Sequence, residues 1–274
     1  SGVLNVALNL VFVIVFKMTV NGVAIATVLS NAISAIVLFR RLCRTDHVIR
    51  IKRTEFKFDA GVAGRILRIG LPAGIQGAVF AVANIVIQSA INSLGTIVMA
   101  ASSAALNIEI IVYDIMNSFS QACTTFTGQN YGAGDLKRCK KSLYLCIIEA
   151  AVACAVSIML ILFFGKSLLA LFNSDPRVVE IGYTRLLIIF SAYTFSMLYE
   201  NMSGYLRGFG LSLVPAILTV FGVCVVRLVW IYTVFPAHRT FTTIMLVYPL
   251  SLATTAVLIF IALMVYRPSK RYQK

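Results

Sequence analysis

Long runs of uncharged, mainly apolar residues recur along the 274-residue chain, and most are long enough to cross about 30 Å of hydrocarbon as helices. Only 12% of the residues are charged and the mean hydropathy is +0.91, which is too apolar for a water-soluble domain of this size. In lipid every backbone polar group needs an internal partner, so uninterrupted runs of this kind form helices. We therefore expect an all-α integral membrane protein with eight membrane helices. The runs are 4–16, 20–39, 71–93, 97–128, 143–164, 181–206, 213–235 and 242–266.

The net charge of +14 is distributed unevenly between the loops. Most basic residues fall in alternate loops, at 40–68, 137–141, 207 and 267–274. The others lie in the remaining loops or at helix ends, where we place Arg185, except for Arg227, which lies inside a predicted span. This positive-inside pattern predicts a plasma (inner) membrane protein whose linker and C-terminus are cytoplasmic. The basic loops would contact anionic lipid headgroups rather than nucleic acid, because no aromatic-studded basic module accompanies them.

Enzyme chemistry finds no support in the sequence. The six cysteines form no CxxC pair, and the two histidines are predicted on opposite sides of the membrane, so no zinc set can be assembled. No nucleophile–base grouping appears, and "YGAGD" (131–135) lacks the Lys-Ser/Thr of a phosphate loop. We expect neither an enzyme nor a metal or organic cofactor.

An internal repeat indicates how the helices are grouped. "NLVFVIVF" (9–16) is similar to "RLVWIYTVF" (227–235), and "SNAISAIVLF" (30–39) to "SLATTAVLIF" (251–260). Repeats of the same topology are typical of the two parallel halves of a transporter, and the alternative is a chance similarity between apolar segments of low complexity. Residues 1–41 would then be the last two helices of an N-terminal bundle, 42–69 a basic linker, 70–267 a six-helix C-terminal bundle and 268–274 a tail. On this interpretation four helices precede Ser1, and the whole protein has twelve.

Polar residues in the spans are the candidates for function. Asn84 and Gln88 share a face of one predicted helix, and Asn107 and Asp114 lie seven residues apart on the next, which also carries Glu109, Tyr113 and Asn117. The span 181–206 carries Ser196, Tyr199 and Glu200.

Each of these residues also has a structural interpretation. The amides could only hydrogen-bond neighbouring helices. Asp114 or Glu149 could pair with Arg227, Arg207 could be an anchor that reaches the membrane surface, and Glu200 could pair with either arginine. The predicted spans nevertheless contain four carboxylates and only one mid-span arginine, Arg227. This excess of negative charge favours a route for protons, sodium or a cationic solute.

Three further motifs carry a resemblance to a known family. "GLPAGIQGAVF" (70–80), "FTGQNYGAGD" (126–135) and "GYLRGFGLSLVPAI" (204–217) resemble the multidrug and toxic compound extrusion (MATE) family over the whole chain. The resemblance implies twelve helices in two bundles around a V-shaped cavity, and export of small, often cationic compounds in exchange for sodium or protons. Two positions depart from the family pattern. Phe80 lies where many members carry a glutamate, and Ser196 where sodium-coupled members carry an aspartate, with Glu200 one turn later.

We therefore expect a fragment of a secondary active multidrug exporter. Glu200 is the leading ion-coupling residue, with Glu109, Ser196 and Tyr113 as partners, and the predicted substrate cavity is formed by Asn84, Gln88, Asn107, Asp114, Asn117 and Tyr199. Two alternatives remain open, a flippase of the related lipid-linked-saccharide exporters and a half-length channel or structural membrane protein.

Overall fold

The computed structural model describes residues 2–45, 50 and 58–268. The chain divides into two compact units, Ser1–Ala63 and Gly64–Lys274, and each is described by itself. Much of the predicted linker (46–49 and 51–57) and most of the predicted tail (269–274) lie outside the described residues.

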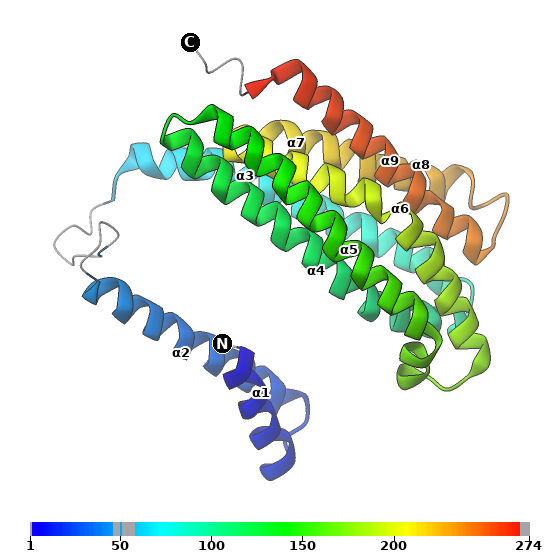
Figure 1. The fold of residues 1–274 in the computed structure, drawn as a ribbon. Coiled ribbons are helices and arrows are strands. Elements are labelled where there is room, and N and C mark those ends of the chain that lie inside the picture. The colour runs from blue at the N-terminus through cyan, green and yellow to red at the C-terminus, as the bar shows by residue number, and fades with distance from the viewer. Residues whose placement is uncertain (1, 46–49, 51–57, 269–274) are drawn as a thin grey trace. The chain divides into compact units, whose positions relative to one another are not determined.

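The first unit is a helical hairpin. Helix α1 (Gly2–Leu10) continues into a π-helix, η1 (Val11–Val15), and then turns into α2 (Val20–Arg44) (Figure 1). Gly22, Ala26 and Ser30 are the buried residues of α2, and their four-residue spacing gives one face of small side chains. Such a face lets two membrane helices approach closely. The Asn5 amide donates to the hydroxyls of Thr27 and Ser30, at 3.2 and 3.3 Å, so polar contacts also join the two helices.

The second unit is a bundle of long helices. They are α3 (Ala60–Asn92, which begins just before the boundary), α4 (Thr96–Gly132), α5 (Leu136–Phe172), α6 (Pro176–Gly208), the continuous segment α7 (Leu213–Thr219), η3 (Val220–Val225, a π-helix) and α8 (Val226–Thr233), and α9 (Phe241–Tyr266). Figure 1 shows α4, α5 and α6 running side by side. Several helices are longer than the apolar runs that predicted them, because a helix can continue through the polar headgroup layers.

Seven helices are long and apolar enough to cross a membrane, and the shorter apolar helix Gly2–Val15 accompanies them. No strand occurs among residues 2–45 and 58–268. The predicted class, an all-α membrane protein with eight apolar helices, is confirmed.

The core of the second unit lies where α4, α6 and α9 meet. Its fully buried side chains include Met116 from α4, Leu186 and Ile189 from α6, and Ile244 and Ile259 from α9. Glycines set the closest approaches between helices. A Cβ on Gly204 would lie 2.5 Å from the carbonyl oxygen of Ser120, and one on Gly208 would lie 2.6 Å from the Cβ of Thr127. The Gly-x-x-x-Gly spacing in α6 therefore brings the backbones of α4 and α6 together.

Candidate functional site

A cavity of about 450 Å³ lies within the second unit. The residues that line it come from α3, α4, α6, η3, α8 and α9, which are distant from one another in sequence. The charged residues of its lining are Glu109, Arg185, Glu200 and Arg227, and four tyrosines accompany them: Tyr113, Tyr193, Tyr199 and Tyr248. The remainder of the lining is mainly aliphatic. The arrangement can hold a small molecule with both apolar and charged parts.

Seven of the ten predicted site residues line this cavity. Pairs spaced by three or four residues face the same way on a helix, which brings both members of each pair to the cavity. These residues are Asn84 and Gln88 on α3, Glu109 and Tyr113 on α4, and Ser196, Tyr199 and Glu200 on α6. Their roles in binding substrate or coupling ions stay predictions.

Asn107, Asp114 and Asn117 do not line this cavity, and their role in binding substrate stays a prediction. Helical geometry explains the difference, because Asp114 is rotated about 140° from Glu109 at 100° per residue. Asn107 and Asp114 are exposed, and the Asn107 amide donates to the carbonyl of Ser103 in its own helix. The two polar stripes of α4 therefore point in different directions.

Glu109 is closed into a buried ion pair. Its two carboxylate oxygens accept from Nε and Nη2 of Arg185, at 2.5 and 2.9 Å, and Nη1 of Arg185 donates to the Ser102 hydroxyl at 2.6 Å. The side chains of Arg185 and Glu109 are 3% and 5% exposed. A bidentate pair of this kind holds a charged carboxylate firmly. Both carboxylate oxygens of Glu109 are therefore already bonded to Arg185 in this arrangement.

The prediction that Arg185 lies at a helix end was wrong. α6 begins at Pro176, so Arg185 lies about two and a half turns inside the helix. The signal was present in the sequence, since Asp175 and Pro176 are a typical N-cap and first helical residue. Arg185 also changes the charge balance of the membrane region, because the carboxylates no longer face a single arginine.

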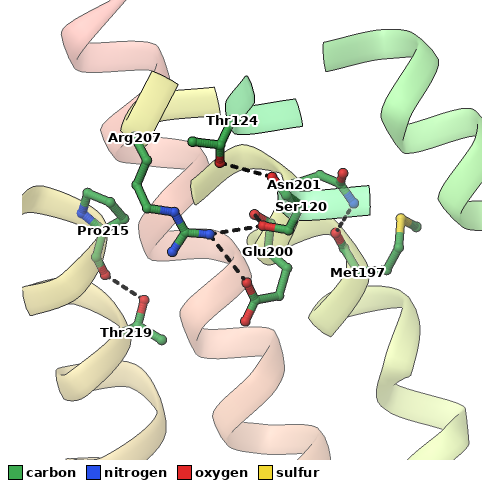
Figure 2. A network of polar contacts seen from close by, with 8 residues as sticks. All are labelled: Ser120, Thr124, Met197, Glu200, Asn201, Arg207, Pro215 and Thr219. Carbon is green, nitrogen blue, oxygen red and sulfur yellow. Dashed lines mark hydrogen bonds and ion pairs between the residues drawn. The ribbon is translucent and has the colours of Figure 1, made fainter. Parts of the chain in front are cut away.

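Glu200 belongs to a looser network at the other end of α6 (Figure 2). Its Oε2 lies 3.7 Å from Nη2 of Arg207, which donates to the Ser120 hydroxyl at 2.9 Å. The Ser120 hydroxyl in turn donates to the backbone carbonyl of Glu200 at 2.8 Å. Arg207 is therefore not simply a surface anchor, and the alternative of a Glu200–Arg207 contact is the one observed. At 3.7 Å this contact is longer than the two bonds of the Glu109–Arg185 pair.

Arg227 lies in α8 and has no acidic partner within 4.0 Å in the described part of the chain. Its Nε donates to the Ser251 hydroxyl at 3.1 Å, and its guanidinium carbon lies 4.2 Å from the centre of the Tyr248 ring. The expected pairs with Asp114 or Glu149 do not form, since both acids are exposed on α4 and α5. Among the described residues no cluster of three or more His, Cys, Asp or Glu side chains could hold a metal ion.

Comparison with known proteins agrees with this architecture. The MatE family model matches residues 72–233, more than half of the chain. A probable multidrug resistance protein, NorM of Thermotoga maritima, is 29% identical over 224 residues, which are 77% of this chain and 46% of that protein. Another, YpnP of Bacillus subtilis, is 30% identical over 229 residues, or 82% of this chain and 50% of that protein.

Solved structures share the same fold. A multidrug resistance MATE family transporter of the MOP superfamily, solved in an outward-facing conformation, superposes with a TM-score of 0.87 at 21% identity, over 98% of this chain and 61% of that one. The chain spans about half the length of the curated relatives it matches.

Proposed function

The chain belongs to the MatE family of membrane transporters, and we propose that it forms the C-terminal part of a secondary active exporter of small molecules. The relatives that support this proposal are named as multidrug resistance proteins. Those names favour drug export over a lipid-linked-saccharide flippase or a half-length channel. The driving ion would be H⁺ or Na⁺, and neither requires a bound organic cofactor.

The observation that carries the proposal is the difference between the two carboxylates of the cavity. Both carboxylate oxygens of Glu109 are bonded to Arg185 at 2.5 and 2.9 Å, whereas the ion pair of Glu200 with Arg207 is longer, at 3.7 Å, and both glutamates border the cavity. A carboxylate that reaches an open cavity can exchange a proton or a sodium ion, and its change of charge then biases the protein between two arrangements. Tyr199 and Ser196 border the same cavity, and their hydroxyls could solvate the ion.

Substrate chemistry is part of the same proposal. The cationic substrates expected from the sequence rested on an excess of membrane carboxylates, and Arg185 and Arg207 reduce that excess. A cationic group would still find Glu200 in the cavity wall, and the four tyrosines would contact apolar or aromatic parts. We infer a plasma-membrane location with the basic linker and the C-terminus in the cytoplasm, where the basic loops would contact anionic headgroups.

The test is Glu200→Gln in the full-length transporter, reconstituted into liposomes. The amide keeps the shape of the protonated acid but cannot exchange an ion. We expect the variant to fold and to bind drug, while drug efflux driven by a pH or sodium gradient falls to the level of empty liposomes. The matched control is Glu180→Gln, because Glu180 lies on the same helix but is exposed and pairs with Lys166 at 2.9 Å. The control should transport normally. Full gradient-driven efflux by the Glu200 variant would remove this residue from the coupling mechanism.

A further inference from the structure

The two arginines of the cavity, Arg185 and Arg227, differ in how many of their guanidinium nitrogens donate hydrogen bonds to the protein. All three nitrogens of Arg185 donate to protein oxygens. Arg227 uses only Nε, toward Ser251, and neither of its Nη atoms has a hydrogen-bond partner among residues 2–45 and 58–268. The residue is nonetheless more than nine-tenths buried, at 7% exposed. Because Arg227 lines the cavity, its two Nη atoms are free to donate to a group bound there.

Two contacts with α9 orient the Arg227 side chain. The Tyr248 ring lies against one face of the guanidinium, and Ser251, one turn further along α9, accepts from Nε. Gly222 brings the preceding η3 turn against α9, since a Cβ there would lie 2.9 Å from the Cα of Thr255. A π-helical turn in the middle of a membrane helix is often found at functional sites. Here it immediately precedes the arginine.

The charges around the cavity leave Arg227 as the uncompensated one. Glu109 neutralises Arg185, and Glu200 lies beside Arg207. Arg227 borders the cavity and has no acidic partner within 4.0 Å among residues 2–45 and 58–268. A guanidinium presents its Nη edge as a fork that matches the two oxygens of a carboxylate.

We propose that Arg227 forms an anion subsite that binds a carboxylate, or a similar oxyanion, of the transported molecule. The proposal rests on the proposed function only in taking the cavity as the substrate site. The substrate class is then an aromatic or apolar molecule with a negatively charged group, either a pure anion or a zwitterion whose cationic part faces Glu200. The tyrosines around the cavity supply the surface for its ring.

The experiment compares three probes with the same ring and different charge: 2-naphthoate, the neutral 2-naphthamide and the cationic 2-naphthylmethylammonium. Binding to the full-length protein in nanodiscs is measured by equilibrium dialysis at neutral pH and constant ionic strength, with empty nanodiscs as the blank. We expect the wild type to bind the carboxylate at least about tenfold more tightly than the amide, the effect of one charge-assisted hydrogen-bonded contact.

Variants then assign the preference to one residue. Arg227→Gln should remove the difference between carboxylate and amide, and Arg227→Lys, which keeps the charge but loses the fork, should retain part of it. The matched control is Arg239→Gln, since Arg239 is exposed in the loop before α9. This control should keep the full difference.

Two results would overturn the subsite. One is a wild type that binds the neutral amide as tightly as the carboxylate, a comparison that needs no variant and stands even if Arg227→Gln fails to fold. The other is a folded Arg227→Gln protein that keeps the preference. The proposed function has a separate readout, because a wild type that prefers the carboxylate but shows no gradient-driven efflux of any drug would contradict export and leave the subsite intact.

Discussion

Breaking the buried pair between α4 and α6 should cost more stability than any surface change, and Glu109→Gln does so with little change of shape. The substitution removes the negative charge and leaves one oxygen to accept from Arg185. Because the two side chains are 3% and 5% exposed, the arginine cannot regain water without opening the helix contact. Removing one partner of a buried pair costs about 3–5 kcal/mol, and we expect the lower end because the amide oxygen keeps one of the two hydrogen bonds.

A double replacement separates the pair from the individual residues. Glu109→Leu with Arg185→Met fills a similar volume without charges, and such replacements are often close to neutral. The double variant should therefore lose much less unfolding free energy than the sum of the two single changes. The assay is reversible unfolding of the purified full-length protein by SDS in mixed micelles, followed by circular dichroism. Glu180→Gln, in the exposed pair with Lys166, is the control and should change little.

Two results would refute this reasoning. If Glu109→Gln were as stable as the wild type, the carboxylate would not be paired with Arg185 in the membrane. If the double variant lost the full sum of the single effects, the two residues would not interact. The same cycle bears on transport, since a low activity of Glu109→Gln that recovers when Arg185 is also neutralised indicates a structural role rather than ion coupling.

Two further predictions concern α6 itself. Gly204→Ala should destabilise the bundle by about 1–3 kcal/mol, because its methyl group would meet the Ser120 carbonyl. The control Gly132→Ala should be neutral in the same SDS titration, because a Cβ there meets nothing within 4 Å. Equal stability of the two variants would contradict the close packing of α4 and α6 at Gly204. Hydrogen bonds from the Arg177 side chain and backbone N–H lower the pKa of the Asp175 carboxyl, so its stabilising effect is present above the ordinary carboxyl pKa and is lost as the pH falls through the lowered value. The melting temperature of the wild type should thus exceed that of Asp175→Asn at neutral pH and approach it in acid, and a gap independent of pH would exclude this origin.

The membrane helices could be predicted from the sequence because hydrophobic length is a local property. All eight apolar runs correspond to helices, and Asn84 and Gln88 of α3, which helical spacing placed on one face, both line the cavity. The partners of the charges could not be found in this way, since Glu109 and Arg185 are 76 residues apart and meet only through the packing of α4 against α6.

The misplacement of Arg185 has a specific physical origin. An average over hydrophobic residues marks where a segment becomes apolar, whereas the helix itself begins at its cap. In this chain the cap, Asp175, comes before the apolar run, and a charged residue can lie inside the helix when a partner compensates it. If the helix start is taken from the N-cap Asp175 rather than from the first apolar residue, Arg185 lies inside the membrane helix.

The π-helical turn at Val220–Val225 has a consequence for the phase of its helix. A π-bulge amounts to one extra residue within regular α winding, so every residue beyond it is rotated by about 100° relative to a wheel drawn from Leu213. Arg227 therefore faces the cavity in a register that an unbroken α-helix would not give it. A relative whose corresponding helix is regular needs one residue fewer in this stretch to direct a side chain to the same place, so equivalent positions on the two sides of the bulge are offset by one residue.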